Sequence, residues 1–209
     1  MTAGGKVSAF GDPDLLTGRL FFALAVPNPV KAPLEAARPA LTGLLPGARF
    51  SAPSGWHLTL AFLGQVRPEF GSDVVTVGEA AAAASPRRLK LKLDGAGGFP
   101  RTDRARVLWA GIGGDLDGLN LLATALAHRC RDAGLRTEDR DFHAHLTLAR
   151  FPEARPLPAD ALERVAGAAR EAPPWESTEL HCYRSTLTNQ GARYTIVRSF
   201  RLGGDTPQP

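Results

Sequence analysis

The sequence predicts a fold of alternating strands and helices arranged as two lobes that face each other across a cleft. The order strand–helix–strand–helix–strand occurs twice, over about residues 19–94 and 106–202. The second strand of each half contains the same tetrapeptide, His-Leu-Thr-Leu, at 57–60 and at 145–148. These matching halves indicate an internal duplication, and we expect their lobes to be related by a pseudo-twofold axis.

The bulk composition is that of a globular protein with a basic surface. A length of 209 residues suits one compact domain or two lobes that share a cleft. Hydrophobic residues make up 44%, which excludes a disordered chain, and the net charge of +4 favours acidic partners such as nucleotides or RNA. Residues 1–18 and 203–209 are rich in Gly, Pro and polar residues, so we expect flexible ends around a single bilobal domain at 19–202.

The cysteines and the apolar runs indicate a cytoplasmic protein that does not enter a membrane. Cys130 and Cys182 form neither a CxxC pair nor a zinc-ligand spacing, so we interpret them as reduced thiols. No apolar run approaches the roughly 18 residues of a membrane span. The run Leu20–Val26 follows a stretch that contains Asp12 and Asp14, which indicates a buried strand and not a signal peptide.

In the first half, we expect strands at 19–26, 56–63 and 89–94 and helices at 30–45 and 68–85. The first strand is apolar and aromatic and ends at Pro27. The first helix is rich in Ala and Leu but is interrupted by Pro33 and Pro39. Leucines alternate with polar residues over 89–94, which predicts a half-buried strand, and Gly95–Pro100 predicts a turn.

In the second half, we expect strands at 106–112, 142–151, 179–187 and 194–202 and helices at 115–134 and 158–171. Asp115 is placed to cap the first of these helices, and Gly134 is placed to end it. The segment Asn189-Gln190-Gly191 joins the last two strands.

The two tetrapeptides place histidine and threonine on one face of a strand. Successive side chains of a strand point to opposite faces, so residues two apart share a face. His57 and Thr59 therefore share one face, as do His145 and Thr147, while the intervening leucines face the core. Two such strands across a cleft would bring two imidazoles and two hydroxyls around one point.

This set of groups suits in-line displacement at phosphorus. One neutral histidine can take a proton from water, and a second, protonated histidine can give a proton to the leaving oxygen, since the ordinary pKa is about 6.5. The threonine hydroxyls can bind the non-bridging oxygens as their charge develops. A single His-Leu-Thr-Leu is an ordinary packing strand, but two copies at matching places favour a function that needs no metal.

The paired HxTx motifs resemble those of the 2H phosphoesterase superfamily. Within it, the chain is similar to the bacterial and archaeal RNA 2′,3′-cyclic phosphodiesterases, also called 2′-5′ RNA ligases. The resemblance runs from about residue 19 to residue 202. Its segments are RLFFAL at 19–24, HLTLAFLG at 57–64, GFP at 98–100, RVLWAG at 106–111, FHAHLTLAR at 142–150, ES at 176–177 and GARYT at 191–195.

The resemblance implies a bilobal α+β fold of two antiparallel sheets with outer helices and a central cleft. It also implies hydrolysis of RNA 2′,3′-cyclic phosphate ends to 2′-phosphomonoesters, with reverse 2′-5′ RNA ligation at the same site. By this resemblance His57 is the proton donor and His145 the proton acceptor, and Thr59 and Thr147 hold the phosphate. The expected partner is RNA with cyclic phosphate termini, and we expect a monomer without cofactor.

Two further residues are candidates for contact with the substrate. Arg150 matches the family's arginine after the second motif, and a guanidinium suits a phosphate. Its odd offset from His145 places it on the opposite face unless the strand bulges. His143 is expected to share the face of His145, although Ala144 stands where the family usually has proline. Trp56, next to His57, is expected to point away from the site into the core.

Three alternatives remain open from the sequence. A metal-binding hydrolase could use His143 and His145 as an HxH pair with His57 as a third ligand, and sensitivity to chelators would reveal it. A nucleotide- or RNA-binding module without turnover would not require both histidines. A cyclic phosphodiesterase acting on a small nucleotide derivative would keep the chemistry and change only the substrate.

Overall fold

The computed structural model describes residues 16–137, 141–189 and 191–203. Most of the two ends expected to be flexible lies outside these residues, as does Gln190 in the last connection. Residues at the margins of the described chain belong to the fold. Leu16 is 2% exposed, and the Gly203 amide donates a hydrogen bond to the Ala82 carbonyl.

Nine strands of the described chain form two antiparallel sheets. The first sheet has the order β3-β1-β8-β9, with β1 at Gly18–Ala25, β3 at His57–Val66, β8 at Glu179–Thr188 and β9 at Gly191–Arg201. The second has the order β2-β6-β5-β4-β7, with β2 at Arg49–Phe50, β4 at Leu89–Phe99, β5 at Ala105–Gly114, β6 at His145–Arg155 and β7 at Trp175–Ser177. Together with the outer helices they confirm the expected α+β class.

The sheets do not coincide with the two halves of the chain. Strand β4 belongs to the first half but pairs with β5, and β8 belongs to the second half but pairs with β1. A short connection joins β4 to β5, and antiparallel strands joined in this way pair readily as neighbours. Each sheet therefore contains two strands from the other half, β8 and β9 in the first sheet and β2 and β4 in the second, which differs from the expectation that each half forms its own lobe.

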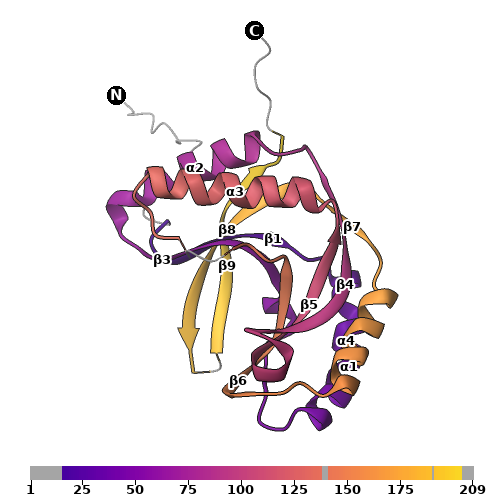
Figure 1. Ribbon diagram of the computed structural model, residues 1–209. Helices are drawn as coiled ribbons and strands as arrows, with labels where there is room; N and C mark the ends of the chain where they lie inside the picture. The colour runs from indigo at the N-terminus through magenta and orange to yellow at the C-terminus, as the bar shows by residue number, and fades with distance from the viewer. Residues whose placement is uncertain (1–15, 138–140, 190, 204–209) are drawn as a thin grey trace, which may run out of the picture.

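Within the described ranges, four α-helices cover the sheets in two pairs (Figure 1). They are α1 at Asn28–Leu44, α2 at Gly71–Ala83, α3 at Leu116–Asp132 and α4 at Ala159–Glu171. Helix α1 lies beside α4, and α2 lies beside α3, so each half contributes one helix to each pair. Helix α1 runs through Pro33 and Pro39. Asp115 caps α3 by accepting a 3.0 Å hydrogen bond from the Gly118 amide, as expected.

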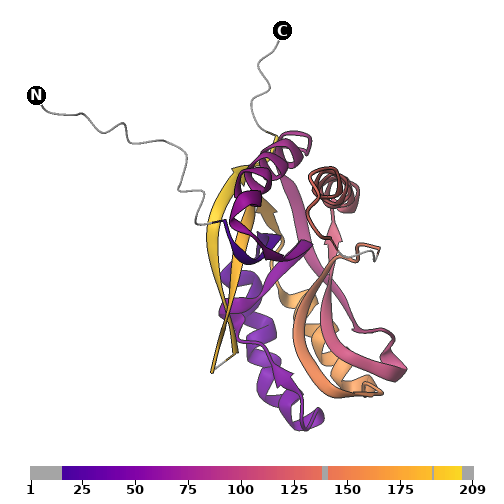
Figure 2. The ribbon, with the colours of Figure 1, turned by 90° about the vertical axis from the view of Figure 1, so that its left-hand side faces the viewer.

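Turned by 90°, the two sheets appear as separate layers that diverge with distance from α2 and α3 (Figure 2). None of the helices in the described ranges is long and apolar enough to cross a membrane.

Some boundaries differ from the expectation. The predicted turn at Gly95–Pro100 is wrong, because β4 continues to Phe99 through a register shift between Leu93 and Ala96. Gly95 takes a φ of +74° there, which glycine adopts without strain. Strand β6 begins at His145, so the expected start at 142 is also wrong. Strands β2 and β7 were not predicted, because two or three residues carry too little periodicity.

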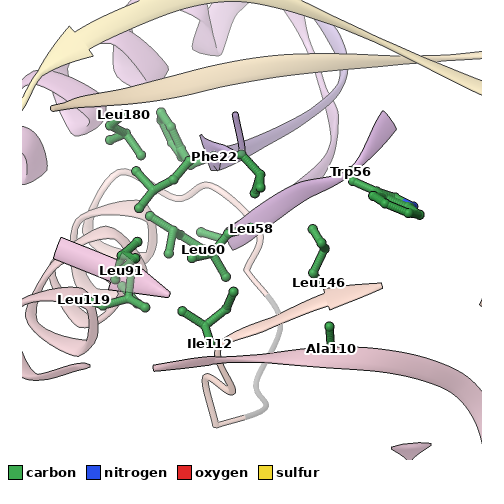
Figure 3. Packing of buried hydrophobic residues seen from close by; sticks show 14 of the residues in the cluster. Phe22, Trp56, Leu58, Leu60, Leu91, Ala110, Ile112, Leu119, Leu146 and Leu180 are labelled. Atoms are coloured by element: carbon green, nitrogen blue, oxygen red, sulfur yellow. The ribbon is translucent and has the colours of Figure 1, made fainter. Parts of the chain in front are cut away.

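One continuous hydrophobic core lies beneath both motif strands. Leu58 and Leu60 of β3 point into the same core as Leu146 of β6 (Figure 3). All three are buried, with exposed fractions of 8% or less. The expected burial of the motif leucines is confirmed.

Candidate active site

A cleft of about 1200 Å³ contains five of the six predicted site residues. His57 and Thr59 reach it from β3, and His145, Thr147 and Arg150 reach it from β6. The two HxTx motifs, 88 positions apart in numbering, thus line one cavity although their strands belong to different sheets.

A bulge at the same place in both motif strands shifts the residues that follow. In β3, Thr59 pairs with Ala23 and Ala61 pairs with Phe22, and in β6, Thr147 pairs with Trp109 and Ala149 pairs with Leu108. Leu60 and Leu148 are thus the extra residues of the two bulges. As a result Arg150 lies on the cleft face together with His145. Its odd offset from His145 allowed this only if the strand contained a bulge, and it does. The equivalent residue of β3 is Phe62, so one half presents a cation where the other has an aromatic ring.

Both catalytic candidates are held by the backbone in the same way. The Nδ1 atom of His57 lies 2.7 Å from the Gly55 carbonyl oxygen, and that of His145 lies 2.7 Å from the His143 carbonyl oxygen. A carbonyl can only accept, so we assign the Nδ1 proton to each ring from this network. In this tautomer Nε2 is the ring atom that gains or loses the proton, as acid–base catalysis requires.

Aromatic rings surround the two imidazoles unequally. The His57 ring lies 4.6 Å from Phe21, 4.8 Å from Tyr194 and 5.6 Å from Tyr183, measured between ring centroids. The His145 ring lies 4.8 Å from that of Phe99, which meets it edge-on. The two histidines therefore occupy different environments within a symmetric arrangement of strands.

Burial lowers the pKa of His57 to about 4, although the bond to the Gly55 carbonyl opposes the shift. The positive charges of Lys31, His145 and Arg150 lower the pKa further. Because desolvation penalises the charged form, His57 is neutral at pH 7 when the cleft holds no anion.

The cleft is cationic. Arg49, Arg150 and Arg193 line it, and all three side chains are exposed. None of the described residues that line the cleft is Asp or Glu. Such a lining favours an anionic ligand, and guanidinium groups match the geometry of a phosphate.

His143 lies outside the cleft lining, unlike the other predicted site residues. It precedes β6 and is exposed, with its ring 4.9 Å from Trp109 and 5.4 Å from Phe99. Its clear contribution is the carbonyl that holds His145. Among residues 16–137, 141–189 and 191–203, no group of three or more His, Cys, Asp or Glu side chains could hold a metal ion.

Sequence reasoning missed the outer part of the cleft. Strand β2 contributes Arg49 and Phe50, and the β8–β9 hairpin contributes Leu187, Arg193 and Tyr194. An Arg-Phe pair shortly before the first motif was the available signal for β2. Nothing in the sequence indicated that the hairpin, about 130 residues further along the chain, would fold back to the first motif.

The family model and the curated relatives that match this chain carry names of one superfamily and one activity. The family model described as the 2′-5′ RNA ligase superfamily matches residues 26–189. An RNA 2′,3′-cyclic phosphodiesterase of Aeropyrum pernix is 36% identical over 143 residues, which cover 68% of this chain and 79% of that protein. One of Escherichia coli K12 is 30% identical over 200 residues, which cover 88% and 96%.

Solved structures agree in fold. Escherichia coli LigT complexed with 3′-AMP has a TM-score of 0.69 and 28% identity, and TT0787 of Thermus thermophilus has a TM-score of 0.67 and 29% identity. In each case the match covers 90% of this chain and 99% of the other.

Acidification is expected to destabilise the protein through His57. The folded-state pKa of about 4 lies below the ordinary value of 6.5, so the unfolded chain binds the proton more tightly. Stability present above pH 6.5 should therefore be lost as the pH falls toward 4, by a few kcal/mol, since one pKa unit is worth about 1.4 kcal/mol. Urea unfolding at about pH 7.5 and pH 4.5 measures this loss.

The control for this measurement is a second histidine. His57→Gln should flatten the pH dependence of the unfolding free energy, whereas His128→Gln, at an exposed site on α3, should retain it. Equal pH dependence in the wild type and in His57→Gln would contradict the assignment.

Proposed function

The chain belongs to the 2′-5′ RNA ligase superfamily, and we propose that it hydrolyses the 2′,3′-cyclic phosphate ends of RNA by acid–base catalysis with two histidines. One observation carries this proposal: two imidazoles, each held through Nδ1, and two threonines from equivalent strands line one cationic cleft. The relatives named RNA 2′,3′-cyclic phosphodiesterase supply the substrate class. A cytoplasmic, monomeric enzyme without cofactor stays a prediction.

The proposed reaction is an in-line attack of water on phosphorus. His145 Nε2 takes a proton from the water as the new P–O bond forms. His57 Nε2 gives its proton to O3′ as the P–O3′ bond breaks, and the product is a 2′-phosphate. Both histidines return to their starting states by exchanging protons with solvent. The hydroxyls of Thr59 and Thr147 and the guanidinium of Arg150 bind the non-bridging oxygens, whose charge develops in the transition state.

The donor role requires a charged His57, although this side chain is neutral in the free cleft at pH 7. A phosphodiester anion beside Nε2 favours the protonated form, because an opposite charge close to a titrating group stabilises its charged state. In this scheme the substrate brings about the protonation of its own catalytic acid.

Removal of either imidazole should abolish most of the turnover. We expect His57→Ala and His145→Ala each to lower kcat by about 10²–10⁴-fold, since acid–base catalysis typically contributes that much. Thr59→Ala and Thr147→Ala should cost less, because each removes a hydrogen bond and leaves the proton transfers. The assay is turnover of an oligonucleotide with a 2′,3′-cyclic phosphate end, with circular dichroism to check the fold.

His128→Ala, at an exposed site outside the cleft, is the control and should keep wild-type turnover. Near-normal activity in either catalytic variant would refute the mechanism. Dialysis against EDTA addresses the metal alternative. A loss of activity restored by zinc or manganese would favour a hydrolase built on His143, His145 and His57 instead.

The product of the reaction shows on which side of the phosphorus atom each histidine acts. In-line geometry places the attacking water and the leaving oxygen on opposite sides of phosphorus, so each histidine serves one side. If His145 activates water and His57 protonates O3′, phosphorus NMR of the products should show the 2′-phosphate. The pH–rate profile should be bell-shaped, because the two roles need opposite protonation states. Exclusive formation of the 3′-phosphate would reverse the assignment of sides.

The size of the cleft favours an RNA chain over a small nucleotide derivative. Its volume of about 1200 Å³ exceeds the roughly 300–1,000 Å³ of small-molecule pockets. The outer part presents two exposed arginines, Arg49 and Arg193, together with Leu187, which is 72% exposed. Cations along a groove with aromatic and apolar side chains suit a single-stranded backbone and its bases.

The double variant Arg49→Ala/Arg193→Ala should therefore affect long and short substrates differently. We expect kcat/KM to fall about tenfold or more on an oligonucleotide and to stay near the wild-type value on a 2′,3′-cyclic mononucleotide. The salt dependence of KM on the oligonucleotide should also weaken, since fewer phosphates are neutralised. Arg201→Ala, exposed at the far end of β9 and outside the cleft, is the matched control. Equal losses on both substrates would argue against this role for the outer cleft.

A further inference from the structure

No strand pairing holds the two catalytic motifs at a fixed distance. Strand β3 lies at the edge of one sheet, β6 lies in the other, and the ladders of the described chain do not pair them. In-line catalysis nevertheless depends on the relative position of two imidazoles, and an error of about 1 Å can cost 10²-fold in rate. The shared core brings the two strands together, and a contact beside the histidines would fix their spacing more closely.

The chain crosses from one sheet to the other just before the first motif. It leaves β2 at Phe50 and enters β3 at His57, and a 3₁₀ turn at Pro53–Gly55 lies between them. Two backbone hydrogen bonds stiffen this crossing, from the Gly55 amide to the Ala52 carbonyl at 2.8 Å and from the Trp56 amide to the Pro53 carbonyl at 3.1 Å.

The first residue of the crossing is bonded to the second motif. The Ser51 amide donates to the Leu148 carbonyl at 2.9 Å. The Ser51 hydroxyl lies 3.0 Å from the carbonyl oxygens of both Thr147 and Leu148, so its single proton can reach either one. Ser51 is therefore bound to the backbone of the strand that carries Thr147 and His145.

The last residue of the crossing, Trp56, is hydrogen-bonded to the first, Ser51. The Trp56 indole nitrogen donates to the Ser51 hydroxyl at 3.2 Å, and Trp56 is 4% exposed. Trp56 precedes His57 directly, and the carbonyl of Gly55 holds His57 Nδ1. One hydroxyl thus joins the residue before the first catalytic histidine to the backbone of the second motif.

We propose that Ser51 and Trp56 are positioning residues, whose hydrogen bonds fix the separation of His57 and His145 for the reaction. This inference rests on the proposed function. Ser51 lines the cleft whereas Trp56 does not. The two residues together therefore distinguish a positioning role from direct contact between the Ser51 hydroxyl and the substrate.

The chain contains a matched control for this pair. The Trp175 indole donates to the Ser177 hydroxyl, also at 3.2 Å, and both side chains are buried. This second pair lies on β7, at the edge of the sheet farthest from β6 in strand order. The two pairs have the same chemistry, and only one of them lies between the catalytic motifs.

The test compares kcat, KM and thermal stability in matched variants. Ser51→Ala and Trp56→Phe should each lower kcat about tenfold or more on a 2′,3′-cyclic phosphate oligonucleotide, with KM within about threefold of the wild type. Ser51→Thr, which keeps the hydroxyl, should restore most of kcat. Ser177→Ala and Trp175→Phe should lower the melting temperature similarly and leave kcat unchanged.

A second measurement does not depend on turnover. Burial and, after it, positive charges that include those of His145 and Arg150 keep the pKa of His57 low. Separation of the strands would expose the ring and move these charges away, so it should raise that pKa toward its ordinary value. Nitrogen-15 NMR titration of the histidines should show the rise in Ser51→Ala and not in Ser177→Ala.

The two measurements separate the possible failures. An inactive wild type would refute the proposed function and leave the NMR comparison to decide on the positioning role. Equal kcat in Ser51→Ala and Ser177→Ala, with an unchanged His57 pKa, would overturn it. A kcat loss in Ser51→Ala but not in Trp56→Phe would also overturn it, in favour of substrate contact by Ser51.

Discussion

The fold depends on two strands, each with an apolar face and an opposite face that carries a histidine and a threonine. The motif leucines of β3 and β6 are buried in one core, so the histidines and threonines must face the opposite side. Burial of each leucine is worth about 1.5–3 kcal/mol, which is enough to fix which face each strand buries. A slip of one residue in either strand would bury its histidine and expose its leucines. Burial of the leucines in the core therefore also determines the direction in which the histidines and threonines point.

The pseudo-symmetric framework supplies two equivalent positions, and local packing makes them unequal. Each imidazole is oriented by a carbonyl two residues before it. The ring of His57, however, is in contact with three aromatic rings, those of Phe21, Tyr183 and Tyr194. The bulges add a second difference, because they place Arg150 on the cleft face of one strand and an aromatic ring at the equivalent position of the other. In the proposed mechanism the two histidines act in opposite protonation states, and their different environments favour that division of roles.

The motifs, and the strand face on which each motif residue lies, were predicted because they depend on a period of two residues that can be read from the sequence. The cleft position of Arg150 was conditional on a bulge, whose presence depends on pairing with β5 and is invisible in β6 alone. The predicted turn at Gly95–Pro100 failed because glycines that usually mark turns here allow a strand to bend. The exchange of strands between the sheets, β2 and β4 for β8 and β9, and the bonds of Ser51 to β6 are long-range features. No period or motif in the sequence encodes them.

The electrostatics of the cleft explain how a buried histidine can serve as an acid. Cations line the cleft and no described carboxylate does, so negative charge near His57 has to come from the ligand. Without the ligand, burial and the neighbouring positive charges keep His57 neutral, which avoids the cost of an uncompensated charge among aromatic rings. In the proposed mechanism, a phosphodiester anion beside His57 reverses this balance where the proton is needed. The protonated acid of that mechanism would be populated mainly in the complex, and the same desolvation that disfavours the free imidazolium would make it a stronger donor to the leaving oxygen.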